Sequence, residues 1–231
     1  NKDPKQYCDE LAEKFKELKE LLNLSEDLHF IRTTDPKHIK AAQEIWNRCK
    51  EKGYIDFKNY EIKYCAGCEL EKTDSELVDG KCPIHHDREM EVREEMNYFF
   101  KFSQFSQDLL NLYEKELAVI PGFRINEMTA LIERGLQDFS ISRVKEKMPW
   151  GIPVPDDGSQ VMYVWFDALT SYISTLGWPE DMETFNKFWT NGTPTQFAGK
   201  DQVRQQAAMW QAMLIAADLP KTKNIVIHGF L

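Results

Sequence analysis

The chain has 231 residues, of which 42% are hydrophobic and 29% charged, so it can bury the core of one large domain or two small ones. A formal net charge of −9 argues against a protein that grips nucleic acid by bulk positive charge, and no run reaches the roughly 20 apolar residues of a membrane span. Five cysteines with no secretory signal argue against a disulfide framework, so we expect a cytoplasmic protein that is not bound to a membrane.

Two helices are predicted in the first quarter of the chain. Asp3 and Asp35 each precede a proline, which is typical of an N-cap followed by the first helical turn, and Gly53 is expected to end the second helix. Apolar residues follow each start at helical spacing: Tyr7, Leu11, Phe15, Leu18 and Leu22, then Ile39, Ala42, Ile45, Trp46 and Cys49. Both stripes are interpreted as core-facing, and Cys8 and Cys49 as core residues.

The middle of the chain changes from helical spacing to turn-rich sequence. Residues 54–100 read as short segments separated by turn residues such as Gly67 and Gly80, which predicts a small β-rich or irregular unit. Helical spacing returns over residues 103–137, where Pro121 separates two helices.

The last third of the chain alternates between strand and helix patterns. Strands are predicted at residues 161–165, 195–198 and 224–228, and helices at 167–176 and 201–217. Such alternation predicts an α/β fold with a parallel sheet. Ligands on parallel sheets gather beyond the carboxyl ends of the strands, which here are residues 165–167, 199–201 and 228–229.

Three of the cysteines lie in a pattern with metal-ligand spacing. Two residues separate Cys65 from Cys68, and after thirteen more residues the same gap separates Cys82 from His85. Two tight turns can bring three thiolates and one imidazole to the tetrahedron that zinc prefers. A unit of about 40 residues has too small a core to fold alone, so we expect a structural zinc ion, with His86 as the alternative fourth ligand.

Several short motifs follow one another along the chain. After the Cys-His spacing they are Asn-Tyr-Phe-Phe at 97–100, Asp-Phe-Ser-Ile-Ser-Arg at 138–143, Trp-Gly-Ile-Pro-Val-Pro at 150–155, Tyr-Val-Trp-Phe-Asp-Ala at 163–168, Gly-Lys-Asp at 199–201 and Val-Ile-His-Gly-Phe at 226–230. In this combination the chain resembles the methionyl-tRNA synthetases, which are class I aminoacyl-tRNA synthetases, over essentially its whole length.

The resemblance implies a Rossmann-type parallel sheet that is interrupted by a connective-peptide insertion with a zinc knuckle. Residues 1–53 would be the helical end of the first catalytic half, and residues 54–140 the insertion, with its knuckle at about 62–100. Residues 141–231 would be the second half of the catalytic domain. Such an enzyme joins methionine to ATP, with Mg²⁺, and transfers the methionyl group to tRNA(Met).

The two ATP-handling signatures of class I synthetases are His-Ile-Gly-His and Lys-Met-Ser-Lys-Ser, and neither is present in the chain. The resemblance implies that the sequence begins after the first signature and stops just before the second. Because those groups stabilise the phosphates in the transition state, we expect that this chain cannot charge tRNA by itself. No catalytic residue is assigned within it.

The resemblance also implies where the substrates bind. Trp165 and Ala168 would wall the methionine side chain, with the Tyr172 hydroxyl near the sulfur. The full set expected for methionine is Trp165, Ala168, Tyr172, Gln206 and Trp210. The set expected for ATP is Gly199, Asp201, His228 and Gly229. Arg143 would contact a phosphate or the tRNA end.

Each of these residues also has a plain structural interpretation. By spacing alone, the aromatic side chains fit a core stripe and Asp201 fits a helix N-cap. His228 and Gly229 fit a strand-end turn, and Arg143 fits a salt bridge. The resemblance favours the substrate-binding interpretation.

Three glutamines depart from the family's pattern. Histidine is more usual in the family at Gln206, and apolar or aromatic residues at Gln202 and Gln205. A different amino-acid selectivity therefore stays open, and with it another class I aminoacyl-tRNA synthetase. A non-catalytic, zinc-stabilised RNA-binding module is the second alternative.

Overall fold

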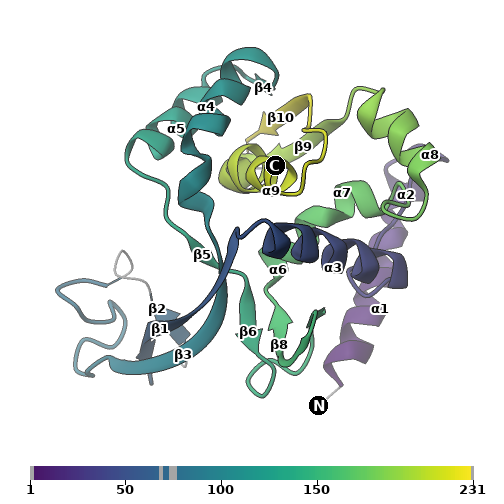
Figure 1. The fold of residues 1–231 in the computed structure, drawn as a ribbon. Helices are drawn as coiled ribbons and strands as arrows, with labels where there is room; N and C mark the ends of the chain where they lie inside the picture. The colour runs from purple at the N-terminus through teal and green to yellow at the C-terminus, as the bar shows by residue number, and fades with distance from the viewer. Residues whose placement is uncertain (1–2, 68–69, 73–76, 230–231) are drawn as a thin grey trace.

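Helix α3 (Pro36–Glu51) crosses the middle of the molecule and carries much of its core (Figure 1). The computed structural model describes residues 3–67, 70–72 and 77–229. As predicted, α3 ends before Gly53, whose φ of 77° suits glycine. The predicted apolar stripe of α3 is buried or partly buried, and the Trp46 ring packs edge-on against Tyr98 and Phe166 at centroid distances of 5.2 and 5.5 Å.

The first predicted helix is present, but its apolar stripe faces away from the core. Helix α1 (Pro4–Lys16) begins as predicted at Asp3, whose carboxylate accepts a backbone N–H of the first turn at 3.1 Å, and α2 (Leu18–Leu21) follows it. The side chain of Tyr7 is 52% exposed and that of Phe15 is 58% exposed.

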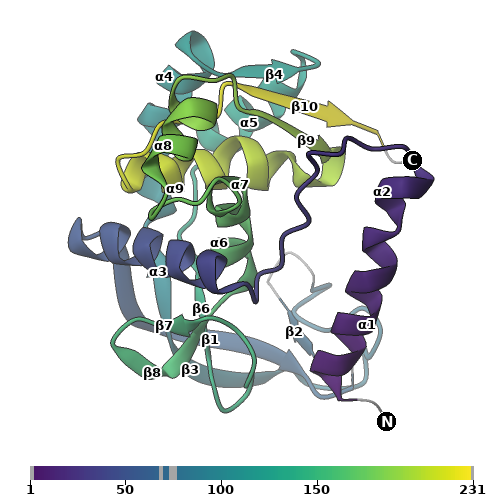
Figure 2. The same cartoon turned by 90° about the vertical axis from the view of Figure 1, so that its right-hand side faces the viewer.

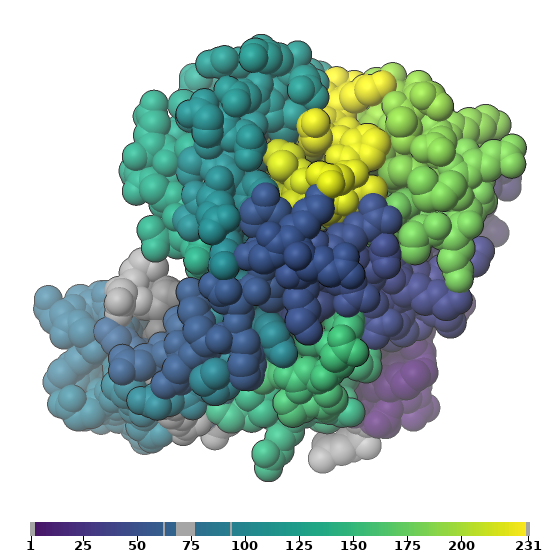
Figure 3. All heavy atoms as spheres, viewed as in Figure 1, coloured from purple at the N-terminus to yellow at the C-terminus, as the bar shows by residue number. Residues whose placement is uncertain are grey.

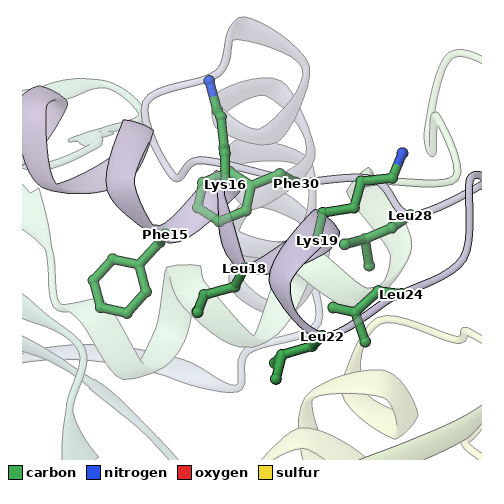
Figure 4. A pocket seen from close by; sticks show the side chains of 8 residues that line it. All are labelled: Phe15, Lys16, Leu18, Lys19, Leu22, Leu24, Leu28 and Phe30. Carbon is green, nitrogen blue, oxygen red and sulfur yellow. The ribbon is translucent and has the colours of Figure 1, made fainter.

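Cys8 is exposed as well, so the predictions of a core-facing first stripe and of a buried Cys8 were both wrong. Helical spacing specifies which side of a helix is apolar but not what covers that side. An open apolar hollow of about 400 Å³ lies beside α1 and α2 (Figure 4). It is lined by Phe15, Lys16, Leu18, Lys19, Leu22, Leu24, Leu28 and Phe30.

A curved β-hairpin leaves the body at the lower left of Figure 1 and projects from it in the space-filling view of Figure 3. β1 (Ile55–Cys65) and β3 (Glu91–Phe100) pair antiparallel through ten residue pairs, so the prediction of short segments was wrong. Charged residues on both faces of these strands hide the alternation that marks a strand. β2 (Leu70–Lys72) and β5 (Phe139–Ser140) complete the sheet in the order β2-β1-β3-β5.

Residues 103–137 are mainly helical, as predicted. α4 (Ser106–Lys115) and α5 (Arg124–Glu133) lie on either side of Pro121. β4 (Ala118–Ile120) lies between them and was not predicted, because three residues give too little alternation to be recognised. Further short elements that the sequence analysis did not identify include η2 (Phe102–Phe105), α8 (Met182–Phe185) and η4 (Asn186–Thr190).

Three strands form the predicted parallel sheet, in the order β4-β10-β9. β9 (Thr195–Gly199) and β10 (Asn224–His228) lie within a residue of their predicted bounds. The mixed α/β class with a parallel sheet is therefore confirmed, and the sheet joins β4 from the middle of the chain to two strands near its end.

The helix predicted over residues 201–217 is present, with an irregular first half. It comprises η5 (Lys200–Gln202), the π-helical η6 (Arg204–Met209) and α9 (Trp210–Ala216). Figure 2 shows α9 lying along one face of β9 and β10. Within the ranges that the structure describes, every helix is too short or too polar to span a bilayer.

The two faces of the parallel sheet differ in burial. Directly opposite residues of neighbouring parallel strands share a face, so the register places Ile120, Val226 and Phe197 in one row. Ile120 is 49% exposed and Phe197 is 70% exposed, whereas the alternate residues of these strands, including Ile225, are buried. Helix α9 thus covers one face of the sheet, and the Phe197 face is left open.

The strand predicted at residues 161–165 needs correction. β8 (Asp157–Met162) ends three residues early and pairs antiparallel with β6 (Ser142–Val144) and β7 (Pro153–Val154), so it lies outside the parallel sheet. The chain then becomes helical at α6 (Val164–Asp167). It continues through η3 (Ala168–Thr170) and α7 (Ser171–Ser174), as predicted for residues 167–176.

Candidate functional site

The carboxyl ends of β9 and β10 meet at the edge of the sheet where the sequence predicts a nucleotide site. Gly199 and His228 are direct partners in the parallel register, which places Asp201 and Gly229 just beyond the two strand ends. A Cβ atom on Gly199 would lie 2.6 Å from Oδ1 of Asp201, so the carboxylate folds back over the glycine backbone. The four residues predicted for ATP therefore share one edge of the sheet.

The polar atoms at this edge are open to solvent. Asp201 is exposed, and its carboxylate accepts the Gln202 side-chain amide at 3.0 Å. His228 is also exposed, and its Nδ1 lies 2.6 Å from the carbonyl oxygen of Gly229. Because a carbonyl only accepts, Nδ1 is the donor in this contact.

An aromatic wall lies on α6 to α7 and on the neighbouring α9. Trp165 and Ala168 are half-buried and stand nearly one turn apart, with Tyr172 one turn further along the chain. The Tyr172 ring is 6.1 Å from the fully buried ring of Trp210, centroid to centroid. The indole N–H of Trp210 is buried and has no hydrogen-bond partner among the described residues. The structure thus joins the residues predicted on two separate segments.

Gln206 lies at the inner end of a hydrogen-bonded network that the sequence analysis missed. Its Oε1 accepts the side-chain amide of Gln196 at 2.5 Å, and Oε1 of Gln196 accepts the Thr222 hydroxyl at 2.6 Å. Gln211 donates to that hydroxyl oxygen at 3.1 Å and to the Gln206 carbonyl at 3.0 Å. The sequence does carry one signal: Gln196 stands on the inward face of β9, two residues before Ala198.

Arg143 is held by oxygen atoms and an aromatic ring. Its Nη1 donates to the Ser140 hydroxyl at 2.9 Å and to the Ser142 carbonyl at 2.7 Å. Its guanidinium carbon lies 4.1 Å from the centroid of the Tyr163 ring. These contacts hold Arg143, the middle residue of β6, against the two serines that precede it.

The predicted zinc ligands that the structure describes lie together. Sγ of Cys65 is 3.7 Å and Sγ of Cys82 is 4.0 Å from Nδ1 of His85, and the three ligand atoms lie within 4.8 Å of one another. A tetrahedral zinc ion places a sulfur and a nitrogen ligand about 3.6 Å apart, so the arrangement fits one. Cys68 lies outside the described residues. His85 is half-buried beside the thiols and His86 is exposed, which favours His85.

Gly67 lets the His85 ring approach the backbone closely. A Cβ atom at Gly67 would lie 2.5 Å from Cγ of the ring, which is closer than real side chains come. Glycine in this turn therefore has a steric reason, and it supports the interpretation of the turn as part of a metal site.

A buried polar cluster under the aromatic wall was also missed. His38 and Ser174 are in contact, with Nδ1 and Oγ 3.0 Å apart, and Nε2 of His38 is 3.9 Å from Oδ1 of Asp167. Burial raises the pKa of Asp167 above its usual value, although His38 acts against that shift. The only sequence signal was polar residues at buried helical positions, which does not identify their partners.

Comparison with known proteins gives a consistent result over the whole chain. The family model "tRNA synthetases class I (M)" matches residues 1–93 and 84–231. Methionine–tRNA ligase of Thermosynechococcus vestitus is 44% identical over 232 residues, which are 99% of this chain and 43% of the relative. The Thermotoga maritima methionine–tRNA ligase is 41% identical over 235 residues, which are 100% of this chain and 36% of the relative.

A solved structure shows the same arrangement of elements. Mycobacterium tuberculosis methionyl-tRNA synthetase in complex with methionyl-adenylate superposes with a TM-score of 0.79 at 37% identity, covering 94% of this chain and 42% of that one. Its ligand-free form gives the same TM-score at 36% identity. The chain spans about two fifths of the length of these relatives.

Proposed function

The chain belongs to the class I tRNA synthetases of the methionine type, and we propose that it forms the methionine- and adenylate-binding part of an enzyme that charges tRNA(Met). The observation that carries the proposal is that two strand ends, at Gly199 and His228, are direct neighbours in the parallel sheet. The helix that follows β9 contributes Trp210 to the aromatic wall. We propose the cytoplasm as its place of action.

In this proposal the amino acid lies against the aromatic wall. Trp165 and Ala168 flank its side chain, and Tyr172 packs on Trp210 so that its hydroxyl can donate to the sulfur, which is a weak acceptor. Gln206 supplies a polar contact at the position where the resemblance implies that histidine is more usual. The Gln196 amide donates to its Oε1, which turns the side-chain N–H₂ of Gln206 into the group that can donate to the amino acid.

The nucleotide lies at the edge of the parallel sheet. The Gly199 backbone allows close approach, the Asp201 carboxylate accepts from the ribose hydroxyls, and His228 and Gly229 lie by the adenine. ATP is a substrate here, and Mg²⁺ would neutralise its phosphates. Arg143 keeps three of its five N–H donors after its two contacts through Nη1, so these can reach a phosphate or the tRNA end.

We also propose a structural zinc ion held by Cys65, Cys68, Cys82 and His85. Thiolate and imidazole ligands in that number close the coordination sphere, so the ion would supply folding energy and not catalysis. The domain division 1–53, 54–140 and 141–231 is proposed with it, and β4 is the part of the middle segment that pairs with β10.

A fluorescence titration tests the proposed function, with six tryptophans as reporters. Since the two ATP-handling signatures are absent from the sequence, binding and not turnover is the measurement. We expect a saturable change with methionine, and about tenfold weaker binding for Tyr172→Ala. Tyr7→Ala removes an exposed tyrosine on α1 and should bind methionine like the parent chain.

The same titration separates the proposal from its competitors. Tighter binding of leucine, isoleucine, valine or cysteine than of methionine would indicate another class I selectivity. No saturable response to any amino acid, with RNA binding retained, would indicate a non-catalytic module instead.

A further inference from the structure

His38 is a fully buried imidazole that the proposed chemistry does not use. It lies on α3. Asp167 on α6 and Ser174 on α7 face it and are only 5% and 2% exposed. The ring meets both: Nδ1 is 3.0 Å from the Ser174 hydroxyl, and Nε2 is 3.9 Å from Oδ1 of Asp167. Burying a titratable ring costs free energy, which its contacts with polar neighbours must offset.

The contact with Asp167 is incomplete. Among the described residues, Nε2 of His38 and Oδ1 of Asp167 are both buried atoms without a hydrogen-bond partner. Their separation of 3.9 Å exceeds a hydrogen bond, which ends at about 3.2 Å, and is too short to place a water between them. A shift of about 1 Å would satisfy both atoms at once.

The cluster is not a hydrolytic Ser-His-Asp site. His38 is 0% and Ser174 2% exposed, so no substrate could reach the hydroxyl. The ring is also turned the other way from a hydrolase, since Nδ1 and not Nε2 faces the serine.

The two partners of His38 flank the part of the chain that carries Ala168 and Tyr172. Asp167 directly precedes Ala168 and stands two residues after Trp165, whereas Ser174 stands two residues after Tyr172. One ring therefore lies against both ends of a segment that carries two of the proposed methionine-binding residues, Ala168 and Tyr172, with Trp165 just before it. The helix that supplies the ring is fixed in the core by Trp46.

We propose that His38 is a positioning residue for the methionine pocket, holding Asp167 and Ser174 so that the segment between them presents its side chains to the amino acid. The proposal rests on the proposed function of that segment.

Three substitutions separate the Nδ1 contact of the ring with Ser174 from its Nε2 contact with Asp167. The amide of His38→Asn reaches the position of Nδ1 and keeps the Ser174 contact, and that of His38→Gln reaches the position of Nε2 and keeps the Asp167 contact. His38→Ala loses both. We expect methionine affinity to fall about tenfold in His38→Ala and to be partly restored in each amide variant.

Hydrogen exchange of the ligand-free chain distinguishes positioning from general loss of stability. We expect His38→Ala to speed amide exchange in residues 164–174 while residues 224–228 keep the parental rate. Equal acceleration in both segments, or methionine affinity within twofold of the parent in all three variants, would overturn the role of His38. If the parent chain binds no methionine, the proposed function fails, and the exchange measurement alone decides whether His38 holds the segment.

Discussion

Gly67 shows how the lack of a side chain at one position can decide whether the proposed metal site forms. The His85 ring sits so close to the Gly67 backbone that even a methyl group would overlap it, at 2.5 Å from Cγ and 2.8 Å from Nδ1. An added methyl must therefore displace the ring that contacts both thiols. The position tolerates only glycine as long as the imidazole is to remain a ligand.

We predict that Gly67→Ala lowers the zinc content from about one ion per chain to less than half, because one of four ligands is displaced. The measurement is elemental analysis of protein purified with zinc supplied. Gly122→Ala is the control, since a Cβ there meets nothing within 4 Å. Full zinc content in Gly67→Ala, or none in the parent chain, would contradict the proposed site.

At the scale of elements, the π-helical η6 places its carbonyls out of the usual α-helical pairing. One of them, the Ala207 carbonyl, accepts the Tyr113 hydroxyl from α4 at 2.8 Å. Burial raises the pKa of Tyr113, so the hydroxyl stays protonated and remains a donor. The π turn beside the candidate site is therefore tied to a helix from the middle of the chain.

Removing that hydroxyl takes one donor away from the buried Ala207 carbonyl. We predict that Tyr113→Phe lowers the free energy of unfolding by about 1–3 kcal/mol, measured by urea denaturation. Tyr7→Phe, at an exposed tyrosine, should stay within about 0.5 kcal/mol of the parent. Equal stabilities for the two variants would show that the contact with Ala207 contributes nothing.

The elements also show what the sequence could predict. The run around Val161 and Trp165 is apolar at every position, and such a run does not distinguish a strand from a buried helix, so the switch to α6 was missed. The edge formed by Gly199 and His228 was predictable because strand ends in a parallel sheet meet. The Gln196 network was not predictable, since alternation shows that a side chain points inward but not which partner it meets.

On the scale of the whole molecule, the hairpin and the main body are stabilised differently. The large apolar cluster includes Ile55 and Phe100, at the base of the hairpin, whereas Cys65 and Cys82 are buried outside that cluster. Among the residues that the structure describes, the tip of the hairpin has local burial but no share of the main core. Its order should therefore depend on the metal.

We predict that chelating the zinc loosens the tip and leaves the parallel sheet intact, because only the tip relies on metal-ligand bonds. Hydrogen exchange should accelerate around Cys65 to His85, while β9 and β10 keep their protection. Loss of protection in all of these elements together would show that the metal stabilises the entire chain and not the hairpin tip alone.

The open face of the parallel sheet has a consequence for measurements of stability. Parallel sheets are nearly always covered on both faces, yet Phe197 and Ile120 stand in water on this one. Each Å² of apolar area left in contact with water forgoes about 25 cal/mol of the stabilising free energy that its burial would contribute. A molecule that binds this face of the folded chain would raise the melting temperature by mass action without contacting the strand ends.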